Sequence, residues 1–287
     1  MWRWIVMLLW ICLDANTVEK PFVAGTLKWR LGNQLFQAAA TISHAIDHDA
    51  EAIFPDLLIN PDHEIPLNRA IFFSQLSLKV PKKVSFTFNE DRPWHYQPIP
   101  WQPNMQITGQ FQSEKYFKHN KAKVLESLKP KEEAVKYIRE KYAEIVNHPY
   151  TVAVHVRAYS LESPKAKNMF APIGLSYYEK AFETFGEEAI FVIFSDRMDF
   201  AKELLKDFSR PHIYLENEAY YNDFILMSLC KHQIISNSTF SWWAAYMNPN
   251  PEKIVIAPAR WMAKKSTQTS RYIVPPDWIT IDWKTAQ

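Results

Sequence analysis

Three apolar, β-rich segments of the sequence end in polar or charged side chains that could bind a ligand. His155 and Arg157 close the segment TVAVHVR, and Asp196 follows the segment AIFVIFS. The third segment, QIIS, runs into a cluster of amide and hydroxyl groups: Asn237, Ser238 and Thr239. In an open parallel sheet, ligands bind beyond the carboxyl ends of the strands. If these segments are parallel strands, their terminal side chains lie together at one edge of the sheet.

The HVR sequence places His155 and Arg157 on the same face of a strand, because side chains alternate with a period of two. An arginine at a strand end can pair bidentately with a diphosphate. The alternative is an ion pair with a carboxylate that closes the end of the sheet. Asp196 also has two interpretations: a hydrogen-bond acceptor for a base or ribose, or the N-cap of a helix predicted at 198–208.

Ser238 and Thr239 begin a segment with a helical pattern, TFSWWAAYMN. Hydroxyl groups and free backbone N–H groups at a helix N-terminus form an anion site, whereas capping alone requires one such side chain. Trp242 and Trp243 are predicted to pack in the core behind this helix end. Asn237-Ser-Thr also matches a glycosylation sequon, but its place between a buried strand and a helix argues against modification.

Asp47-His48-Asp49 is a D-x-D sequence, the pattern with which some nucleotide-sugar enzymes hold a divalent metal ion. It lies near the end of a predicted helix, where side chains two residues apart point to different faces. No metal site is therefore predicted. The two cysteines, Cys12 and Cys230, provide neither a disulfide framework nor a cysteine metal site, and Cys230 is predicted to be a small buried hydrophobe.

The elements that must position these side chains alternate along the second half of the chain. Strands are predicted at 151–156, 189–194, 212–215, 233–236 and 253–257, with helical patterns of about ten residues between them. This alternation is typical of right-handed βαβ units and a parallel sheet. A long amphipathic segment at 131–146, begun by Pro130, is predicted to form the helix that leads into this sheet.

The first half is less regular. PFVAGTL predicts a strand, NQLFQAAATISHAI a helix with one apolar face, and VSFTF and MQITGQF two weaker strands around a loop rich in Pro and Trp. The sequence therefore predicts two α/β halves with a boundary near 147–150 and a binding cleft between them.

Composition limits the kind of ligand site. The net charge of +2 does not favour a general polyanion-binding role, so no nucleic-acid partner is predicted. The five glycines have no dinucleotide-binding or Walker spacing. A phosphate site must therefore be built from side chains and helix N-termini.

The N-terminus has an apolar run from Trp4 to Leu13, which is too short to span a bilayer. It fits a signal peptide, with Ala15 as the cleavage position, or a short hydrophobic anchor. The protein is therefore expected in the secretory pathway (the Golgi lumen if eukaryotic) or in peripheral association with a membrane.

Together these segments resemble the α-1,2-fucosyltransferases of glycosyltransferase family 11, roughly over residues 22–262. RLGNQLFQAAA is similar to the family's G-x-L-G-N-Q-M/L-F-Q-Y-A, and GQFQSEKYF to its G-Y-F/W-Q-S-E-K-Y-F. HVR, IFSD and APARW resemble its H-x-R-R-G-D-Y, F-S-D-D and A-P-x-x-W. The longest match is NDFILMSLCKHQIISNSTFSWWAAYMN, against the family's D-x-x-L-M-S-x-C-K-H-x-I-I-A/S-N-S-T-F-S-W-W-x-A-x-L.

The resemblance implies a GT-B-type α/β fold, with two Rossmann-like halves whose parallel sheets face a cleft. After the signal peptide or anchor at 1–20, it implies an acceptor-side α/β domain at 21–148 and a GDP-sugar-binding domain at 149–287. It implies transfer of L-fucose from GDP-fucose, with inversion, to the 2-hydroxyl of a terminal galactose of a glycan. Neither a cofactor nor a metal ion is expected.

The resemblance also implies roles for individual residues. Arg157 is expected on the diphosphate, Asp196 at the nucleoside, and Gly32 and Asn33 near the donor phosphate and the acceptor. Arg157 and Asn33 are the expected catalytic residues. The remaining expected contacts are His155, Asn237, Ser238, Thr239 and Phe240 on the donor, and Arg30 and Gln112 on the acceptor side. No residue is assigned as general base, for which an Asp, Glu or His of the N-terminal half is a candidate.

The chain departs from the family pattern directly after Arg157. Where the family has R-R-G-D-Y, this sequence has Arg157, Ala158, Tyr159 and Ser160. The loss of an arginine and an aspartate leaves two alternatives open: an inactive glycan- or nucleotide-binding protein on the same fold, or a GT-B enzyme that uses another sugar nucleotide.

Overall fold

The computed structural model describes residues 20–62, 64–263 and 270–282. The predicted signal peptide or anchor lies outside these residues, apart from Lys20, and it stays a prediction. Within the described part of the chain, no helix is both long enough and apolar enough to cross a membrane.

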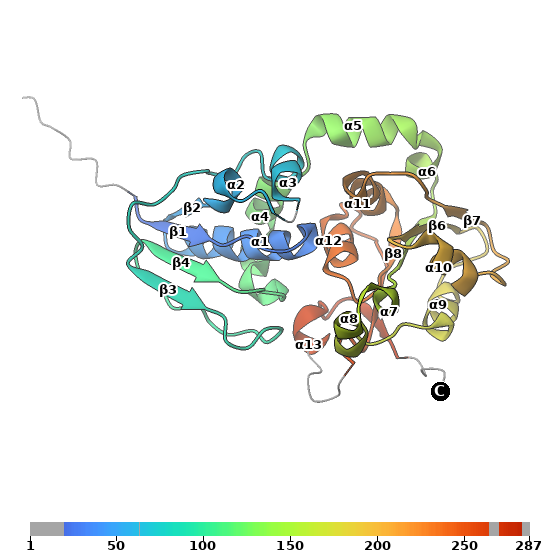
Figure 1. Ribbon diagram of the computed structural model, residues 1–287. Coiled ribbons are helices and arrows are strands. Elements are labelled where there is room, and N and C mark those ends of the chain that lie inside the picture. The colour runs from blue at the N-terminus through green and yellow to red at the C-terminus, as the bar shows by residue number, and fades with distance from the viewer. Residues whose placement is uncertain (1–19, 63, 264–269, 283–287) are drawn as a thin grey trace, which may run out of the picture.

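Two parallel sheets form the frame of the molecule, one from each half of the chain (Figure 1). The first has the strand order β2-β1-β4-β3. Its strands are β1 (Phe22–Gly25), β2 (Glu51–Ile53), β3 (Phe86–Asn89) and β4 (Met105–Thr108). The sequence predicted all of them except β2, because three residues are too few to show a periodic pattern.

The second sheet has the strand order β10-β9-β8-β5-β6-β7, again entirely parallel. Its strands are β5 (Thr151–Val156), β6 (Ile190–Ser195), β7 (His212–Tyr214), β8 (His232–Ile234), β9 (Val255–Pro258) and β10 (Ile279–Ile281). The short edge strand β10 was not predicted. The predicted α/β class with two parallel sheets is confirmed.

The register of the second sheet brings the predicted strand ends together. Strand β5 lies in the middle, and Val156 of β5 pairs with Ser195 of β6. Arg157 and Asp196 therefore leave the sheet side by side. Strand β8 pairs with the other edge of β5, so the segment that begins with Asn237 leaves at the same end of the sheet.

Helices cover the two sheets and connect them. Those of the first half are α1 (Leu31–Asp47), α2 (Asp56–Ile59), α3 (Ile65–Ile71), η1 (Glu114–Tyr116), η2 (Lys118–Asn120) and α4 (Lys121–Leu128). The link between the halves carries α5 (Glu132–Lys141) and α6 (Ala143–Asn147). Those of the second half are α7 (Tyr159–Glu162), α8 (Pro164–Met169), α9 (Leu175–Phe182), α10 (Met198–Leu204), α11 (Tyr220–Leu229), α12 (Thr239–Met247) and α13 (Ser270–Ile273).

The helix predicted at 131–146 is two helices, which corrects the sequence-based expectation. The break falls at Tyr142, whose backbone has φ −115° and ψ 36°. Its hydroxyl donates a hydrogen bond to Glu218, 2.6 Å away, in the second half. The break between α5 and α6 thus coincides with a contact between Tyr142 and Glu218, which are far apart in the sequence. Helical periodicity cannot predict such a contact. In Figure 1, α5 crosses from the first half toward the second.

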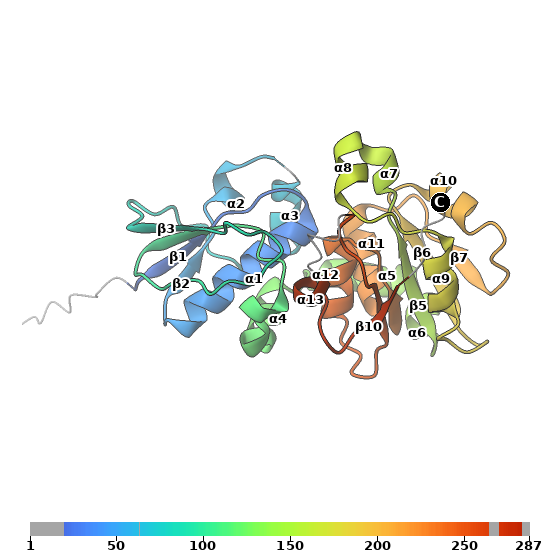
Figure 2. The same ribbon diagram turned by 90° about the horizontal axis from the view of Figure 1, so that it is seen from below.

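Helix α1 is buried on nearly all sides, although its sequence predicted one apolar face. It packs on β1 on one side and against α12 on another, and Figure 2 shows it directed toward α12. Phe36 of α1 lies with its ring 4.5 Å from that of Trp242 and 5.2 Å from that of Trp243. Both tryptophans are fully buried, so their predicted role in core packing is confirmed. One hydrophobic cluster therefore runs through both halves.

The N-terminal ends of α1 and α12 touch at Gly32. A Cβ added there would lie 2.5 Å from the carbonyl carbon of Thr239 and 2.6 Å from the nitrogen of Phe240. Both neighbours are backbone atoms at the start of a packed helix, so they cannot move aside easily.

Gly32→Ala is expected to lower the melting temperature. Overpacking of this kind costs about 1–3 kcal/mol, which corresponds to a fall in Tm of roughly 2–12 °C for a chain of this size. The matched control is Gly174→Ala, because a Cβ at Gly174 meets nothing within 4 Å. Gly174 is the N-cap of α9, a position where alanine is less favourable than glycine. Alanine also lowers the conformational entropy of the unfolded chain, and this stabilising effect offsets the weaker cap, so little change in Tm is expected. Equal melting temperatures for the two variants, measured by circular dichroism, would contradict the close contact at Gly32.

Candidate functional site

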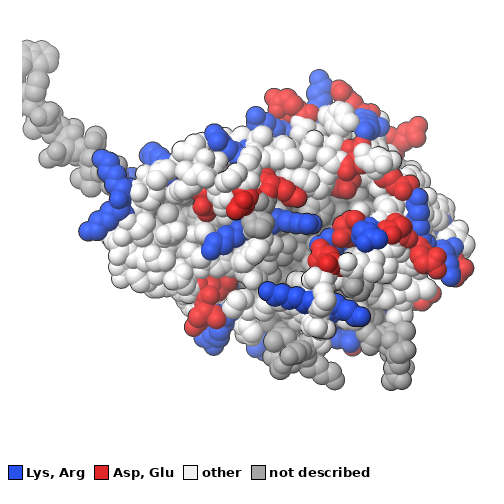
Figure 3. Space-filling view, in the orientation of Figure 1, with Lys and Arg blue, Asp and Glu red and all other residues white. Residues whose placement is uncertain are grey.

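A cleft of about 570 Å³ lies between the two halves. The first half contributes the loop and helix start at 29–33 together with Glu64. The second half contributes residues from the ends of β5 and β6, from α7, and from the starts of α11 and α12. Over the face shown in Figure 3, basic and acidic side chains are interspersed and do not gather by sign. This face therefore shows no single-sign patch that would attract an anion.

Most of the residues predicted from the sequence line this one cleft. They are Arg30, Gly32, Asn33, His155, Arg157, Asp196, Ser238, Thr239 and Phe240. They come from the ends of β5 and β6, from the starts of α12 and α1 and from the loop before α1, and these two halves of the site are far apart in the sequence. Two predicted residues, Asn237 and Gln112, do not line the cleft.

Asn237 and Gln112 contact protein atoms. Asn237 is 1% exposed, and its amide donates hydrogen bonds to the carbonyl oxygens of Ala171 and Trp261, both at 2.9 Å. Its side-chain nitrogen is thus bonded within the protein, and its burial makes the sequon inaccessible. Gln112 is buried, and its Nε2 donates to Oδ1 of Asn33 at 2.6 Å. Gln112 therefore orients Asn33, which does line the cleft.

Arg157 is held by two carboxylates. Its guanidinium forms ion pairs with Asp196 and Glu162, while its side chain is only 12% exposed. The alternative predicted for Arg157, an ion pair at the end of the sheet, is therefore present. Asp196 is not the N-cap of α10, a position taken by Arg197. Within the described structure, Nε of Arg157 is buried and has no hydrogen-bond partner.

An aromatic pair supports this arginine. The centre of the Arg157 guanidinium lies 4.8 Å from the ring centroid of Tyr159, and the Tyr159 ring stacks on Phe170 at 4.0 Å. Tyr159 and Glu162 both belong to α7, the segment where the chain departs from the family pattern. The departure therefore changes the immediate surroundings of Arg157.

His155 adds a neutral group beside Arg157. Its side chain is 5% exposed, and its Nδ1 lies 2.8 Å from Oγ of Ser236. Burial, followed by the nearby charge of Arg157, lowers the pKa of His155 to about 3. The imidazole is therefore uncharged near neutral pH and offers hydrogen bonds without charge.

The start of α12 faces the same cleft. Ser238 is the N-cap, and its hydroxyl accepts a hydrogen bond from the backbone nitrogen of Phe240 at 3.3 Å. Thr239 and Phe240 are half-buried at the cleft surface. This helix N-terminus and the guanidinium of Arg157, which is paired with Asp196 and Glu162, place hydrogen-bond donors at the same cleft, and such donors suit an anion.

Asp223 was not singled out from the sequence, yet it lines the cleft. Burial, followed by the charge of Glu218, raises the pKa of Asp223 to about 7. Within the described structure, its Oδ1 has no hydrogen-bond partner. The signal that could have revealed it is an acid in the first turn of the otherwise largely apolar helical run YYNDFILMSL, where a carboxyl group loses part of its contact with water. Such a group accepts hydrogen bonds from a ligand readily.

The two acids of the D-x-D sequence turn to different partners, as their spacing predicted. Asp47 accepts hydrogen bonds from His119 and Asn120, whereas Asp49 pairs with Lys20 at 2.7 Å. Among the described residues, no group of three His, Cys, Asp or Glu side chains is placed to hold a metal ion.

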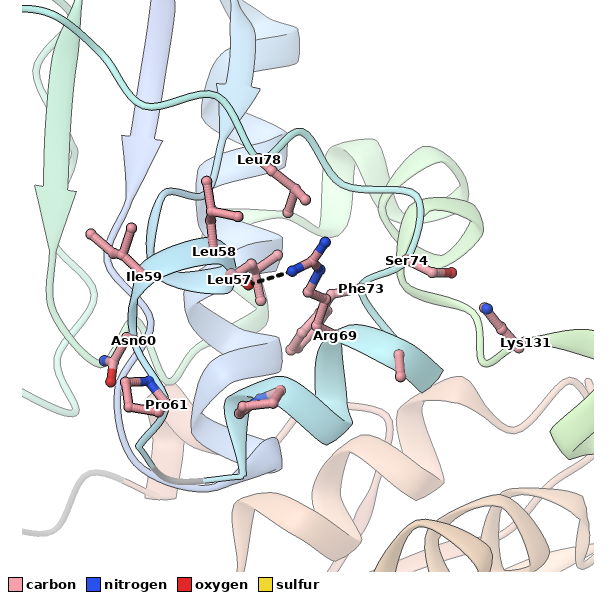
Figure 4. A pocket seen from close by; sticks show the side chains of 12 residues that line it. Leu57, Leu58, Ile59, Asn60, Pro61, Arg69, Phe73, Ser74, Leu78 and Lys131 are labelled. Carbon is pink, nitrogen blue, oxygen red and sulfur yellow. Dashed lines mark hydrogen bonds between the residues drawn. The ribbon is translucent and has the colours of Figure 1, made fainter.

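A second cavity, of about 630 Å³, lies within the first half around α2 and α3 (Figure 4). Its walls combine apolar side chains with Asn60, Arg69, Ser74 and Lys131, and Arg69 donates a hydrogen bond to the carbonyl oxygen of Leu57 at 3.3 Å. None of the residues predicted from the sequence to bind a ligand lines it. The cleft between the halves is therefore the candidate site.

Comparison with known proteins agrees with this geometry. The family model described as glycosyl transferase family 11 matches residues 25–282. The O-antigen biosynthesis glycosyltransferase WbnK of Escherichia coli is 35% identical over 127 residues, which cover 42% of this chain and 41% of that protein. Galactoside alpha-(1,2)-fucosyltransferase 2 of Mus musculus is 27% identical over 234 residues, which cover 76% of this chain and 66% of that protein. The chain thus spans less than two thirds of the length of these two relatives.

Among solved structures, the alpha-1,6-fucosyltransferase NodZ from Bradyrhizobium, soaked with GDP-fucose, is similar with a TM-score of 0.53. The match covers 80% of this chain and 93% of that chain at 13% identity. A likeness at this identity concerns the fold, and it confirms the predicted GT-B arrangement of two parallel sheets.

Glu162→Gln is expected to strengthen the binding of inorganic diphosphate by roughly three- to tenfold, as measured by calorimetry. The substitution removes a carboxylate that competes with an anion for Arg157, and tenfold corresponds to about 1.4 kcal/mol. The side chain of Glu162 is 33% exposed, so solvent screening limits the effect. Glu187→Gln makes the same charge change at an exposed position outside the cleft. If both variants bind diphosphate equally, Glu162 does not restrain Arg157.

Proposed function

The chain belongs to glycosyl transferase family 11, and from this premise we propose that it transfers L-fucose from GDP-fucose to the 2-hydroxyl of a terminal galactose of a glycan. We propose that the transfer inverts the configuration at the fucose carbon and needs no metal ion. The observation that carries the proposal is the convergence of Arg157 and the N-terminus of α12 on one wall of the cleft. That wall suits a diphosphate.

The proposed chemistry follows from where charge develops. As the bond between fucose and the diphosphate breaks, the leaving GDP gains negative charge. Preorganised cations and helix N-termini stabilise such charge without reorganising at the moment of reaction. Arg157 and the N–H groups and hydroxyls at Ser238 and Thr239 would supply this stabilisation. His155, uncharged beside Arg157, would add a hydrogen bond.

The nucleoside would extend along the second half, which we propose as the donor-side domain at 149–287. Asp196 lines this part of the cleft and is the proposed partner of the ribose or base. Asp223 is a further candidate, because its unpartnered oxygen can accept from the amino group of guanine. Two carboxyl groups on one wall would favour a base and a ribose that donate hydrogen bonds.

The first half, 21–148, would hold the acceptor. Gly32 lets α1 approach the start of α12, and Asn33 lies in the same turn with its side chain oriented by Gln112. Arg30 is exposed at the edge of the cleft. Asn33 lines the cleft and follows Gly32, the residue that meets Thr239 and Phe240, which supports its proposed catalytic role between donor and acceptor.

The inactive binding protein remains a second candidate, because a specific contact favours it. In the structure, carboxylates from Asp196 and Glu162 occupy the guanidinium that the donor diphosphate would need. Measuring GDP release with a panel of galactosides separates the two functions. Sustained release excludes the inactive protein, and competition of GDP-fucose against GDP-mannose and UDP-galactose identifies the donor.

GDP is expected to raise the melting temperature, and Arg157→Ala is expected to abolish the rise. At a hundredfold excess over Kd, a ligand stabilises the folded state by about 2.7 kcal/mol, which corresponds to a shift of roughly 5–10 °C. Arg92→Ala is the control, since Arg92 lies in an exposed loop with its side chain 72% exposed. No shift with wild-type protein would contradict the nucleotide site.

Asp223→Asn is expected to weaken GDP binding and to remove part of its pH dependence. With a pKa of about 7, the Asp223 carboxyl is ionised above pH 7 and accepts hydrogen bonds best there. Wild-type affinity should therefore fall as the pH is lowered from 8 to 6, and the variant, measured in parallel by calorimetry, should show a flatter profile.

The same substitution has the opposite effect on the free protein. Because the pKa of Asp223 is higher in the folded than in the unfolded protein, its carboxyl group favours folding only while it is protonated. The free energy of unfolding therefore falls as the pH rises from the unfolded-state pKa through 7. Asp223→Asn should therefore melt at a higher temperature than wild type at pH 8. Parallel pH profiles for GDP binding in the two proteins would contradict the proposed contact.

A further inference from the structure

Two residues on the first-half wall of the cleft have a left-handed backbone. Trp29 and Glu64 both have φ of 65°, and both line the cleft. This region favours glycine, and a bulky side chain there is strained. Residues held in such conformations cluster at functional sites, where the surrounding structure fixes them. The conformation alone assigns no function, because Trp94 shares it outside the cleft. What Trp29 and Glu64 present to the cleft decides their role.

Trp29 presents a large apolar surface to the cleft. The Trp29 residue is 40% exposed, whereas Trp242 and Trp243 in the neighbouring helix α12 are fully buried. Its backbone is fixed from α1, because Nε2 of Gln34 donates to the carbonyl oxygen of Trp29 at 2.5 Å. The next backbone nitrogen toward the N-terminus, that of Lys28, donates to Gln37 at 2.8 Å. An exposed indole thus sits on a rigid loop.

Glu64 is tied to the same network. It is the N-cap of α3, and one turn later Asn68 donates a hydrogen bond to Oε1 of Gln34 at 2.9 Å. Asn68 also accepts from the hydroxyl of Tyr220 at 2.8 Å, which brings in the second half of the chain. Buried side chains therefore hold the segments of Trp29 and Glu64 in fixed positions relative to each other and to α11.

The carboxylate of Glu64 is available to a ligand. It is half-buried, and among the described residues it has no hydrogen-bond or ion-pair partner. The other acids that line the cleft, Glu162, Asp196 and Asp223, all belong to the second half. Glu64 is thus the acid that the described first half contributes to this surface.

We propose that Trp29 and Glu64 form the binding surface for the acceptor sugar. A pyranose has an apolar C–H face, which packs on an indole ring, and a rim of hydroxyl groups, which donate to a carboxylate. The phosphate wall lies on the second half, so a donor bound there leaves the first-half wall to the acceptor. This inference rests on the proposed function and adds the groups that recognise a galactose-terminated acceptor.

The test uses Trp29→Gly and Glu64→Gln with lactose and methyl β-galactoside as acceptors. Glycine suits a φ of 65°, so Trp29→Gly removes the indole and the strain together. We expect its Tm to stay within about 4 °C of wild type or to rise. We expect KM for both acceptors to rise roughly tenfold or more in each variant, while the Kd for GDP changes less than about twofold.

Trp94→Gly is the matched control. Trp94 has φ of 66°, nearly that of Trp29, and it does not line the cleft. The control should leave the KM for both acceptors unchanged. A role of Trp29 in folding alone would lower Tm without a selective rise in acceptor KM, and this result would overturn the inference.

Other outcomes distinguish this inference from the proposed function. If Trp29→Gly weakens GDP binding as much as it raises acceptor KM, the indole contacts the nucleotide and the inference is wrong. If wild type binds GDP but neither binds nor fucosylates a galactoside, the donor site stands and the acceptor surface is wrong. If wild type binds no GDP, the proposed function itself fails.

Discussion

The packing of α1 against α12 is the contact on which the rest of the structure depends. Both helices are almost wholly buried, and their facing side chains include Phe36, Trp242 and Trp243. Gly32 allows their N-terminal ends to meet without a side chain between them. Since the free N–H groups of a helix lie at its N-terminus, this packing brings the proposed phosphate wall of the second half, Arg157 and the start of α12, beside the turn of the first half that carries Asn33.

Within the cleft, the charge of Arg157 is compensated before any ligand arrives. A partly buried guanidinium without a counter-ion is costly, and here Asp196 and Glu162 provide the opposite charge. His155 stays neutral in the same surroundings because burial disfavours its protonated form. A diphosphate would compete with the carboxylates for Arg157. The segment that replaces the family's R-G-D-Y thus affects both the charge and the access of the proposed donor site.

A second set of contacts fixes the opposite wall. Gln34, Asn68 and Tyr220 form a chain of hydrogen bonds that begins at the carbonyl oxygen of Trp29 and crosses into the second half. Buried polar groups with satisfied hydrogen bonds hold one geometry, because an unsatisfied group in the interior is expensive. This network explains how two residues with left-handed backbones are kept at the cleft surface, and it supports a wall that is shaped in advance for a ligand.

By itself, the sequence determined the α/β class, most strands, and the set of strand-end residues that meet at one edge, because apolar periodicity is local and parallel strands end together. It could not show that Asn237 binds backbone carbonyls, that Glu162 pairs with Arg157, or that Asp223 faces the cleft. It also predicted a single apolar face for α1, whereas α12 of the second half covers a further side of that helix. It predicted one helix at 131–146, where the structure has two helices separated at Tyr142. Only the tertiary structure decided these points, because most depend on a partner atom from a distant part of the chain, and the pair of Glu162 with Arg157 depends on how the chain turns after β5. No local pattern records which atoms meet.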